Sequence, residues 1–421
     1  MVCRFSAQEA LTIEDAIKTA LEKNFSVLIV KNQKEIASLQ NNAGNAGMSP
    51  TVSLNGSISN SSINSYQVFN NGTVQDRPGA TAKGISGSLN ADWTIFDGLR
   101  MFAIRKRLGM NEQLTALQLK QQMENTVYDV ISAYYNVVRV KELIKAARQN
   151  LTIYEERRKI AEVRREIGSD SRVEVLLSKS DENKAHSTII QLELELLDSR
   201  TRLNALLGRA IDVDFNTADS IVVNYNPAID ELKKNVVTSN AGILISKQNE
   251  LIAAQSVREA RSSYLPFITV SGAYIYTRTR SDAGFVLSNR QNGLNLGITG
   301  RWTLFNGGRN SKLVQERNIL ALKQRLISDQ TRLQVDALVY INYQSYLLNR
   351  KIVEMELQNL ADSKEVQNIS LERYRVGKAN LLETIETQKN LEDAQVRYIN
   401  ALYKIKLSEA ELLRVNGELV K

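Results

Sequence analysis

The sequence predicts a mainly α-helical, tandem-repeat fold in which each repeat also carries a membrane-type β-hairpin. Three observations lead to this prediction. The stretch Trp93–Arg100 recurs 209 positions later as Trp302–Arg309. An alternating, strand-like segment precedes each copy, and a long segment without proline follows each copy. The chain therefore consists of two units that each run in the order helix, hairpin, long helix, turn, helix.

The repeat extends well beyond the doubled motif. Gly168 and Gly208 recur as Gly377 and Gly417 at the same offset of 209, whereas Pro50 matches Pro266 at an offset of 216. The first hairpin must therefore have the longer loop. The predicted boundaries are a first repeat over 11–226 (hairpin 50–96, long helix 97–167, turn at 168, return helix to 208) and a second over 227–421 (hairpin 266–305, long helix 306–376, turn at 377, return helix to 417).

Each repeat begins with a helical pattern and continues into an alternating one. The segment from Leu11 to Asn42 has helical spacing, with Thr12 as its N-cap. Apolar and polar residues then alternate with a period of two, and we expect loops over Asn60–Lys83 and Thr277–Asn292. Strands of about ten residues with one apolar face suit a membrane-spanning β-sheet. Soluble amphipathic strands alternate in the same way.

The long helical segments predict an oligomer. No proline occurs between Asp97 and Ile167, and neither proline nor glycine occurs between Arg309 and Val376. Asp97 and Asn306 are placed to cap these helices. Segments of about 70 residues reach roughly 100 Å at 1.5 Å per residue, which is too long for a compact domain. Because four strands are also too few to close a barrel, we expect several copies to assemble.

Composition excludes several classes of function. One cysteine, Cys3, and one histidine, His186, leave no zinc centre, disulfide framework or Ser-His-Asp triad, so we predict no metal, no cofactor and no enzyme activity. His186 is expected on the surface. The net charge of +8, from 54 basic and 46 acidic residues, fits a solvated helical surface better than a nucleic-acid footprint. No apolar run is long enough for a transmembrane helix.

Residues 1–10 read as an N-terminal tail with the remnant of a signal peptide. Phe5-Ser6-Ala7-Gln8 looks like the end of a secretory signal, although the apolar core that should precede it is missing. Cys3 is a candidate for a lipid anchor, but no lipobox-like apolar run precedes it.

The doubled motif, the doubled hairpin and Tyr374-Arg375-Val376-Gly377 before an acidic helix start resemble the TolC family of bacterial outer-membrane efflux channels. The resemblance covers Leu11 to Gly417. It implies a homotrimer whose twelve strands form one β-barrel in the outer membrane, continued by a helical barrel across the periplasm. The implied function is a passive exit duct for efflux or type I secretion. Its implied partners are a periplasmic adaptor protein, an inner-membrane pump or ABC transporter, and outer-membrane lipid, with no nucleic acid.

The resemblance also implies a gate at the periplasmic turns. Glu383 and Glu386 match two acidic residues around the closed aperture, and Tyr374 and Glu174 match residues that hold it shut. A solvated pair that complements the helix dipole is the alternative for the two glutamates. The family's arginine lock falls at Ala379 here, which leaves Arg172, Lys378 and Arg375 as candidates for its replacement.

Two further sets of residues follow from the matched motifs. Ile167-Gly168 and Val376-Gly377 match the turns that meet the adaptor, and they also suit simple helix C-caps. The hairpin and helix motifs place a junction at the following residues: Trp93, Phe96, Asp97, Gly98, Trp302, Phe305, Asn306 and Gly307. The two tryptophans suit either the membrane interface or packing between strands and helices.

The alternative function is a non-transporting coiled-coil protein that tethers parts of the cell envelope. This alternative explains the long helices but does not explain four amphipathic strands in two hairpins. A need for detergent distinguishes the channel from this rod and from a soluble enzyme.

Overall fold

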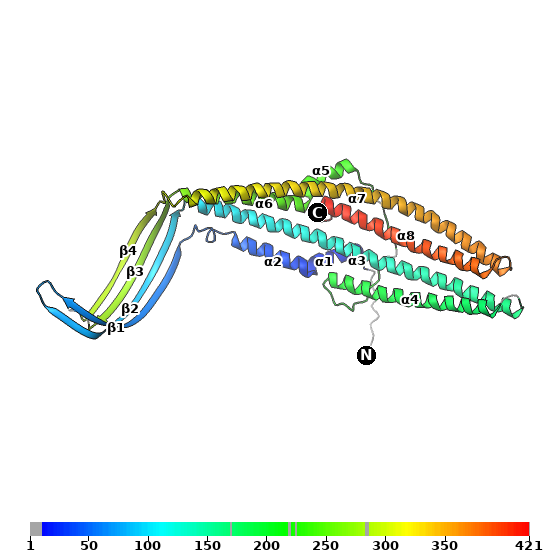
Figure 1. Ribbon diagram of the computed structural model, residues 1–421, viewed down its shortest axis with the longest axis horizontal. Coiled ribbons are helices and arrows are strands. Elements are labelled where there is room, and N and C mark those ends of the chain that lie inside the picture. Colours follow the sequence, from blue (N-terminus) through cyan, green and yellow to red (C-terminus); the bar gives the residue numbers. More distant parts are fainter. Residues whose placement is uncertain (1–10, 169–170, 218–219, 224, 283–285, 421) are drawn as a thin grey trace. The chain divides into compact units, whose positions relative to one another are not determined.

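The computed structural model describes residues 11–168, 171–217, 220–223, 225–282 and 286–420. Figure 1 shows the elements in sequence colours. The helices and strands are α1 (Ile13–Lys23), α2 (Phe25–Gln40), β1 (Thr51–Val68), β2 (Val74–Phe96), α3 (Arg100–Glu166), α4 (Arg172–Leu206), α5 (Ile229–Ser239), α6 (Ala241–Arg261), β3 (Phe267–Ser281), β4 (Ser288–Arg301), α7 (Arg309–Arg375) and α8 (Leu381–Asn416), with a 3₁₀ turn at Ser262–Tyr264.

The chain forms two compact units, and each draws on both repeats. The helical unit contains Ala116–Ser246 and Ser328–Lys421 together with the chain up to Gln33. The sheet unit contains Lys34–Thr115 and Lys247–Ile327. The sequence repeats are therefore not the compact units, because α2, α3, α6 and α7 each run from one unit into the other.

The helical unit is built from two antiparallel helix pairs, α3 with α4 and α7 with α8 (Figure 1). Each pair buries its own apolar cluster beside a short helix of the same repeat. The first cluster consists of Ala16, Ala20, Val130, Tyr134, Val137, Val138, Leu203, Leu207 and Phe215. The second consists of Leu232, Val236, Ile243, Val335, Val339, Tyr346, Ile405, Leu412 and Val415.

The first helix of each repeat is broken at an asparagine, so the prediction of one continuous helix over Leu11–Asn42 is wrong. Asn24 separates α1 from α2, and its side chain donates to Leu206 O (2.8 Å) while accepting from Ser26 N (2.9 Å). Asn240 makes the equivalent bonds in the second repeat, to Val415 O (2.7 Å) and from Ile243 N (2.9 Å). One amide thus ties the return helix to the start of the next helix, and this tertiary contact outweighs local helix propensity.

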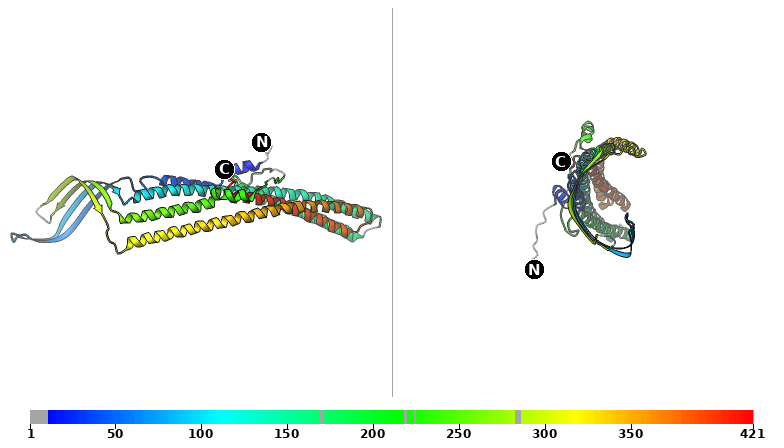
Figure 2. Two further views of the ribbon diagram at one scale, coloured as in Figure 1. Left: turned by 90° about the horizontal axis from the view of Figure 1, so that it is seen from above. Right: turned by 90° about the vertical axis from the view of Figure 1, so that its left-hand side faces the viewer.

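The sheet unit contains one antiparallel sheet in the order β1-β2-β3-β4, which forms a single curved layer (Figure 2). Register places the apolar residues of all four strands on one face, as the pairs Leu54↔Leu89, Leu89↔Tyr274 and Tyr274↔Leu294 show. The other face carries serine, threonine and asparagine, for example in the pair Thr269↔Thr299. The alternation in the sequence therefore corresponds to two distinct faces of the sheet.

The predicted loops at Asn60–Lys83 and Thr277–Asn292 are wrong, because the strands are longer than their composition suggests. β1 and β2 remain paired out to Val68↔Val74, with one irregularity between Ile63 and Ser65. At that point the Asn64 side chain accepts from Gly79 N (2.7 Å). Asn, Ser and Gly favour turns locally, but cross-strand hydrogen bonds to an aligned partner outweigh that preference.

The two long helices, α3 and α7, contain 67 residues each. Each begins three residues after the aspartate or asparagine that was predicted as its cap. Asp97 Oδ1 nevertheless accepts from Met101 N (3.1 Å), and Asn306 Oδ1 accepts from Asn310 N (3.3 Å), so both side chains satisfy a backbone donor of the first turn. Among the residues with defined structure, no helix combines enough length with enough apolar character to cross a membrane.

Candidate functional site

Two turns of the helical unit end the long helices, and each contains a left-handed glycine. Gly168 has φ 80° and Gly377 has φ 75°, and a Cβ at either position would meet nothing within 4 Å. Both glycines therefore serve as C-caps that need positive φ while facing open space. The preceding residues, Ile167 and Val376, are 73% and 64% exposed, so each turn also presents one aliphatic side chain to solvent.

The structure gives different surroundings to Glu383 and Glu386, the two glutamates that were predicted at the gate. Glu383 forms an ion pair with Arg373 (2.9 Å), and its backbone N–H donates to the Asn380 side chain (2.8 Å) at the start of α8. Glu386 is exposed and has no polar partner within the described part of the chain. The Glu383 charge is thus balanced within the chain, whereas the Glu386 charge is not.

Tyr374 lies at the contact between the two repeats. Its side chain is 1% exposed, and Arg164 of α3 donates to its carbonyl oxygen (2.7 Å). The same guanidinium lies 4.7 Å from the centre of the tyrosine ring, within the range of a cation–π interaction. Glu174, the remaining predicted gate residue, is half-buried in the first turn of α4, where its N–H donates to Ser171.

The contact made by Arg164 was not predicted from the sequence, although the repeat marks this position. Arg164 precedes Gly168 by four residues, as Arg373 precedes Gly377 by four, so the two arginines are repeat equivalents. They act differently because of their surroundings. Arg373 stays within its own turn, where it donates to Lys378 O (3.3 Å), whereas Arg164 reaches across to the other repeat.

Among the three candidates for the lock, Arg375 is the one that contacts the other repeat within the described part of the chain. It forms ion pairs with Glu156 of α3 and with Glu372 of its own helix (2.7 Å). Arg172 is exposed and makes no polar contact with any described residue, and Ala379 donates only its N–H, to Arg373 O (3.2 Å). Arg164 and Arg375 therefore together join α3 to α7 near the turns.

A second group of ion pairs joins α3 to α4 further from the turns. Arg157, only 2% exposed, pairs with Asp181, and Arg158 pairs with Glu182 (2.5 Å) and Glu162 (2.7 Å). Hydrogen bonds to these two glutamates raise the pKa of Arg158. Arg157 is buried, so its loss would leave Asp181 with only the exposed Lys184 as an ion-pair partner (3.3 Å), and the guanidinium therefore helps to hold the two antiparallel helices in register.

One cluster in the helical unit offers ligand atoms of the kind that bind metals. Single ligand atoms of Glu155, Glu182 and His186 all lie within 4.8 Å of one another. Imidazole and carboxylate together suit zinc or another first-row divalent cation. Arg158 already pairs with one Glu182 oxygen at 2.5 Å, so a metal ion at this place would share that carboxylate with a guanidinium or displace it.

The hairpin bases repeat one hydrogen bond almost unchanged. The Trp93 indole donates to Met48 O (2.8 Å), and the Trp302 indole donates to Tyr264 O (3.0 Å). Met48 and Tyr264 each precede the proline before a strand by two residues, so each indole ties the return strand to the chain that enters the hairpin. This hydrogen bond satisfies the indole N–H donor whether the ring faces lipid or packs between strands and helices.

The turn from each hairpin into its long helix uses two successive left-handed residues. They are Gly98 and Leu99 in the first repeat (φ 72° and 68°) and Gly307 and Gly308 in the second (φ 69° and 79°). Phe96 is half-buried just before this turn, whereas Phe305 is 84% exposed in the single chain. The same backbone path is therefore built from different side chains.

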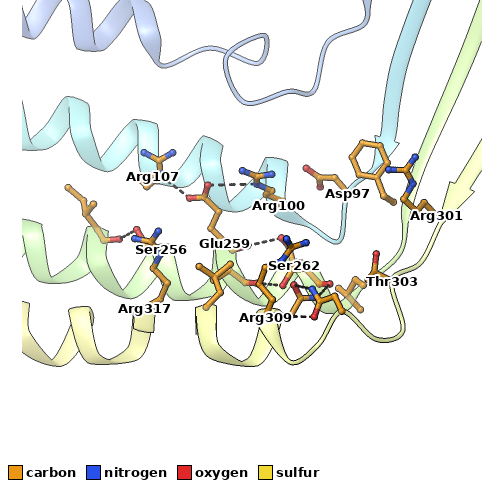
Figure 3. A pocket seen from close by; sticks show the side chains of 18 residues that line it. Asp97, Arg100, Arg107, Ser256, Glu259, Ser262, Arg301, Thr303, Arg309 and Arg317 are labelled. Atoms are coloured by element: carbon orange, nitrogen blue, oxygen red, sulfur yellow. Dashed lines mark hydrogen bonds and ion pairs between the residues drawn. The ribbon is translucent and has the colours of Figure 1, made fainter. Parts of the chain in front are cut away.

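A pocket of about 790 Å³ lies beside these turns in the sheet unit (Figure 3). Its charged lining residues are Asp97, Arg100, Arg107, Glu259, Arg301, Arg309 and Arg317. Arg100 and Arg107 both contact Glu259, at 3.8 Å and 3.0 Å. The repeated motif includes Asp97, Asn306 and two of these arginines, Arg100 and Arg309, but no role was predicted for the arginines, which come from α3, β4 and α7.

The comparisons with known proteins all point to one family. A family model described as "Outer membrane efflux protein" matches residues 16–209 and 223–418. The outer membrane efflux protein BepC of Brucella suis is 20% identical over 330 residues, which is 77% of this chain and 70% of the relative. The outer membrane protein TolC of Vibrio cholerae is 19% identical over 309 residues, or 72% of this chain and 70% of the relative.

Solved structures show the same fold at low identity. The Vibrio cholerae outer membrane protein VceC superposes with a TM-score of 0.78 at 15% identity and covers 96% of both chains. The Campylobacter jejuni CmeC outer membrane channel gives a TM-score of 0.80 at 14% identity, covering 100% of this chain and 91% of that one. These matches confirm the fold class and the resemblance inferred from the doubled motif. The chain belongs to the outer membrane efflux protein family.

Proposed function

We propose that this outer-membrane efflux channel is the exit duct of a tripartite efflux or type I secretion system and works as a homotrimer. The observation that carries the proposal is the sheet. Its four strands leave β1 and β4 as edges that pair with one neighbouring strand only among the described residues. Exposed edges of this length need partners, and three copies supply twelve strands for a closed barrel.

The two faces of the sheet give the barrel its orientation. Leu54, Leu294 and Leu296 are 81%, 65% and 76% exposed in the single chain, and all lie on the apolar face. Hydrocarbon is the solvent that suits such a face, and the opposite serine, threonine and asparagine face suits a water-filled lumen. The helical unit then lies in the periplasm.

In this proposal the turns at Gly168 and Gly377 form the periplasmic end of the duct and its gate. The Arg164–Tyr374 and Arg375–Glu156 contacts support a closed state, because they hold α3 and α7 together across the repeats. Glu386 contributes a carboxylate that has no partner among the described residues, and a ring of such carboxylates favours cations. Glu383 and Glu174 begin the two return helices at equivalent positions, and Glu174 is half-buried.

The adaptor contacts the same turns in this proposal. Ile167 and Val376 are repeat equivalents, both are more than half exposed, and each lies beside a glycine with open space around its Cα. Two matching aliphatic side chains per subunit suit repeated contacts by identical adaptor hairpins, with an inner-membrane pump or ABC transporter reached through the adaptor.

Mass and single-channel conductance of the detergent-purified protein test the proposal. We expect a trimer that gives a small, cation-selective conductance in a planar bilayer, because the gate is closed and acidic. A monomer without conductance would mean that the repeats build a rod that tethers envelope components instead.

A further inference from the structure

The pocket at the hairpin bases has an excess of positive charge. It is lined by the ends of β3 and β4, by the last turns of α6 and by the first turns of α3 and α7. Five arginines face two carboxylates in this lining: Arg100, Arg107, Arg301, Arg309 and Arg317 against Asp97 and Glu259 (Figure 3). We call this the arginine pocket.

The charges of the arginine pocket are only partly compensated within the chain. Arg100 and Arg107 share the single carboxylate of Glu259. Arg301, Arg309 and Arg317 form no ion pair with any residue that the structure describes. Among the described residues of one chain, three guanidinium charges without an ion-pair partner therefore surround one cavity of about 790 Å³.

The backbone adds to this positive field. α3 begins at Arg100 and α7 begins at Arg309, and both residues line the pocket. The N-terminus of a helix carries partial positive charge, which favours anions nearby. At the start of α3, the Asp97 carboxylate accepts from Met101 N (3.1 Å) and partly offsets this positive charge. At the start of α7, the uncharged Asn306 side chain accepts from Asn310 N (3.3 Å) and leaves the positive charge in place.

The two strand residues that line the pocket belong to the polar face of the sheet. Arg301 and Phe267 are register partners, and they continue the row that contains the Thr269↔Thr299 pair. The apolar residues Ile268 and Ile298 belong to the opposite face. A lipid headgroup would approach from the apolar face, so the position favours an anion that arrives through water.

We propose that the arginine pocket is a binding site for soluble multivalent anions that carry phosphate or several carboxylates. The planar guanidinium groups suit such oxygens, because each can donate two parallel hydrogen bonds. The binding itself does not depend on the proposed duct. Its location in the lumen does rest on that function, and a trimer would then present three such sites where the barrel meets the helices.

Inorganic tripolyphosphate is the probe for the test. Calorimetric titration of the detergent-purified protein at low salt should show binding that weakens as salt is added. The variant R301Q/R309Q/R317Q should bind at least about tenfold more weakly, because charge-assisted hydrogen bonds are lost. The control variant K323Q/R325Q/R332Q removes the same number of charges from exposed positions of α7 outside the pocket, and we expect it to bind within about twofold of the original protein.

Equal weakening in both variants, or no binding at all, would overturn the proposal. A circular dichroism spectrum and melting curve of each variant show that the comparison concerns folded protein. The titration is repeated in nanodiscs of phosphatidylcholine with and without phosphatidylglycerol. If phosphatidylglycerol competes with tripolyphosphate, the site takes lipid and the soluble-anion assignment is wrong.

Single-channel recording separates this inference from the proposed function. Tripolyphosphate should reduce the conductance of the original protein and of the control variant, but not that of R301Q/R309Q/R317Q. A conducting trimer that does not bind tripolyphosphate would refute the arginine pocket and leave the duct intact. Binding without any effect on conductance would instead contradict a lumenal location.

Discussion

Gly98 is a position where a single added methyl group has no room. Its φ of 72° is left-handed, and an added Cβ would collide with the carbonyl oxygen of Ser262 and approach Leu265 Cβ to 2.9 Å. Its equivalent, Gly307, has a similar φ of 69° but nothing within 4 Å of an added Cβ. The two positions therefore separate backbone strain from steric collision.

We expect Gly307→Ala to cost about 1–2 kcal/mol through backbone strain alone. Gly98→Ala should cost clearly more, since backbone atoms near Ser262 must also move. Denaturant unfolding of both variants in detergent measures the difference. Equal losses of stability would show that the contact between Gly98 and Ser262 is not retained in the assembled protein.

Glu124 predicts a dependence of stability on pH. It is 3% exposed, its nearest cation is Lys120 Nζ at 3.7 Å, and burial raises its pKa above 4.5 more than Lys120 lowers it. A carboxyl whose pKa is raised in the folded state binds its proton more tightly there. Stability is therefore lost as the pH rises from 4.5 through the folded-state pKa.

Glu124→Gln should accordingly melt at a higher temperature than the original protein at pH 8, and the gap should close near pH 4. Lys120 keeps its bonds to Ser239 O (3.3 Å) and Gly417 O (3.4 Å), so the substitution does not leave it alone. Thermal melting across this pH range measures the gap. A variant that is less stable at pH 8 would show that the Lys120 pair outweighs desolvation.

At the scale of elements, the long helices are joined near their turns by arginines rather than by apolar packing alone. Arg164 of α3 contacts both the carbonyl and the ring of Tyr374 on α7. Such a contact is worth about 1–3 kcal/mol. If it holds the gate shut, its loss moves the closed–open equilibrium by the same amount.

Arg164→Ala should therefore raise the ratio of open to closed channels in single-channel recordings by roughly 5- to 150-fold. Arg172→Ala is the matched control, because Arg172 lies next to the same turn but is exposed and contacts no described polar group. If both variants open equally, the effect is one of net charge at the turn and the Tyr374 contact is not a lock.

The two glutamates proposed for the gate, Glu383 and Glu386, give a prediction at the same scale. Arg373 neutralises Glu383 at 2.9 Å, while Glu386 has no partner among the described residues. Glu386→Gln should reduce the potassium-over-chloride selectivity roughly by half, and Glu383→Gln should reduce it less. Reversal potentials in a KCl gradient measure both. Unchanged selectivity in the double variant would remove these carboxylates from the aperture.

At the scale of the whole molecule, the division of the sheet into two faces decides what surrounds it. Leu296 lies on the apolar face, and its neighbour Asn295 lies on the polar face of the same strand. Lysine at a lipid-facing site near the bilayer midplane costs about 2–4 kcal/mol. Leu296→Lys should therefore lower stability by that amount, whereas Asn295→Lys should change it little.

Urea unfolding in lipid vesicles measures this pair. A larger loss for Asn295→Lys than for Leu296→Lys would reverse the assignment of the two faces and place the arginine pocket on the lipid side. The pair thus tests the orientation of the barrel without depending on transport.

The sequence predicted most of the elements and part of the site. The doubled motif located both hairpin bases, and Gly168 and Gly377 lie at the turns because few other residues adopt positive φ there. Periodicity also assigned the strand residues to two faces, because the geometry of an extended backbone makes successive side chains point to opposite sides. The loop that composition predicted at Asn60–Lys83 was wrong, because pairing between β1 and β2 decided the structure there.

What the sequence determined by itself was therefore local and repetitive: the two repeats, the positions of the turns, the amphipathic strands and, through them, the family. What only the tertiary structure decided were the contacts between residues far apart in the chain. Arg164 meets Tyr374 across 210 positions, and the arginine pocket gathers side chains from five elements. Periodicity reports the surroundings of a residue along its own helix or strand, but long-range packing chooses its partners, and no local pattern encodes that choice.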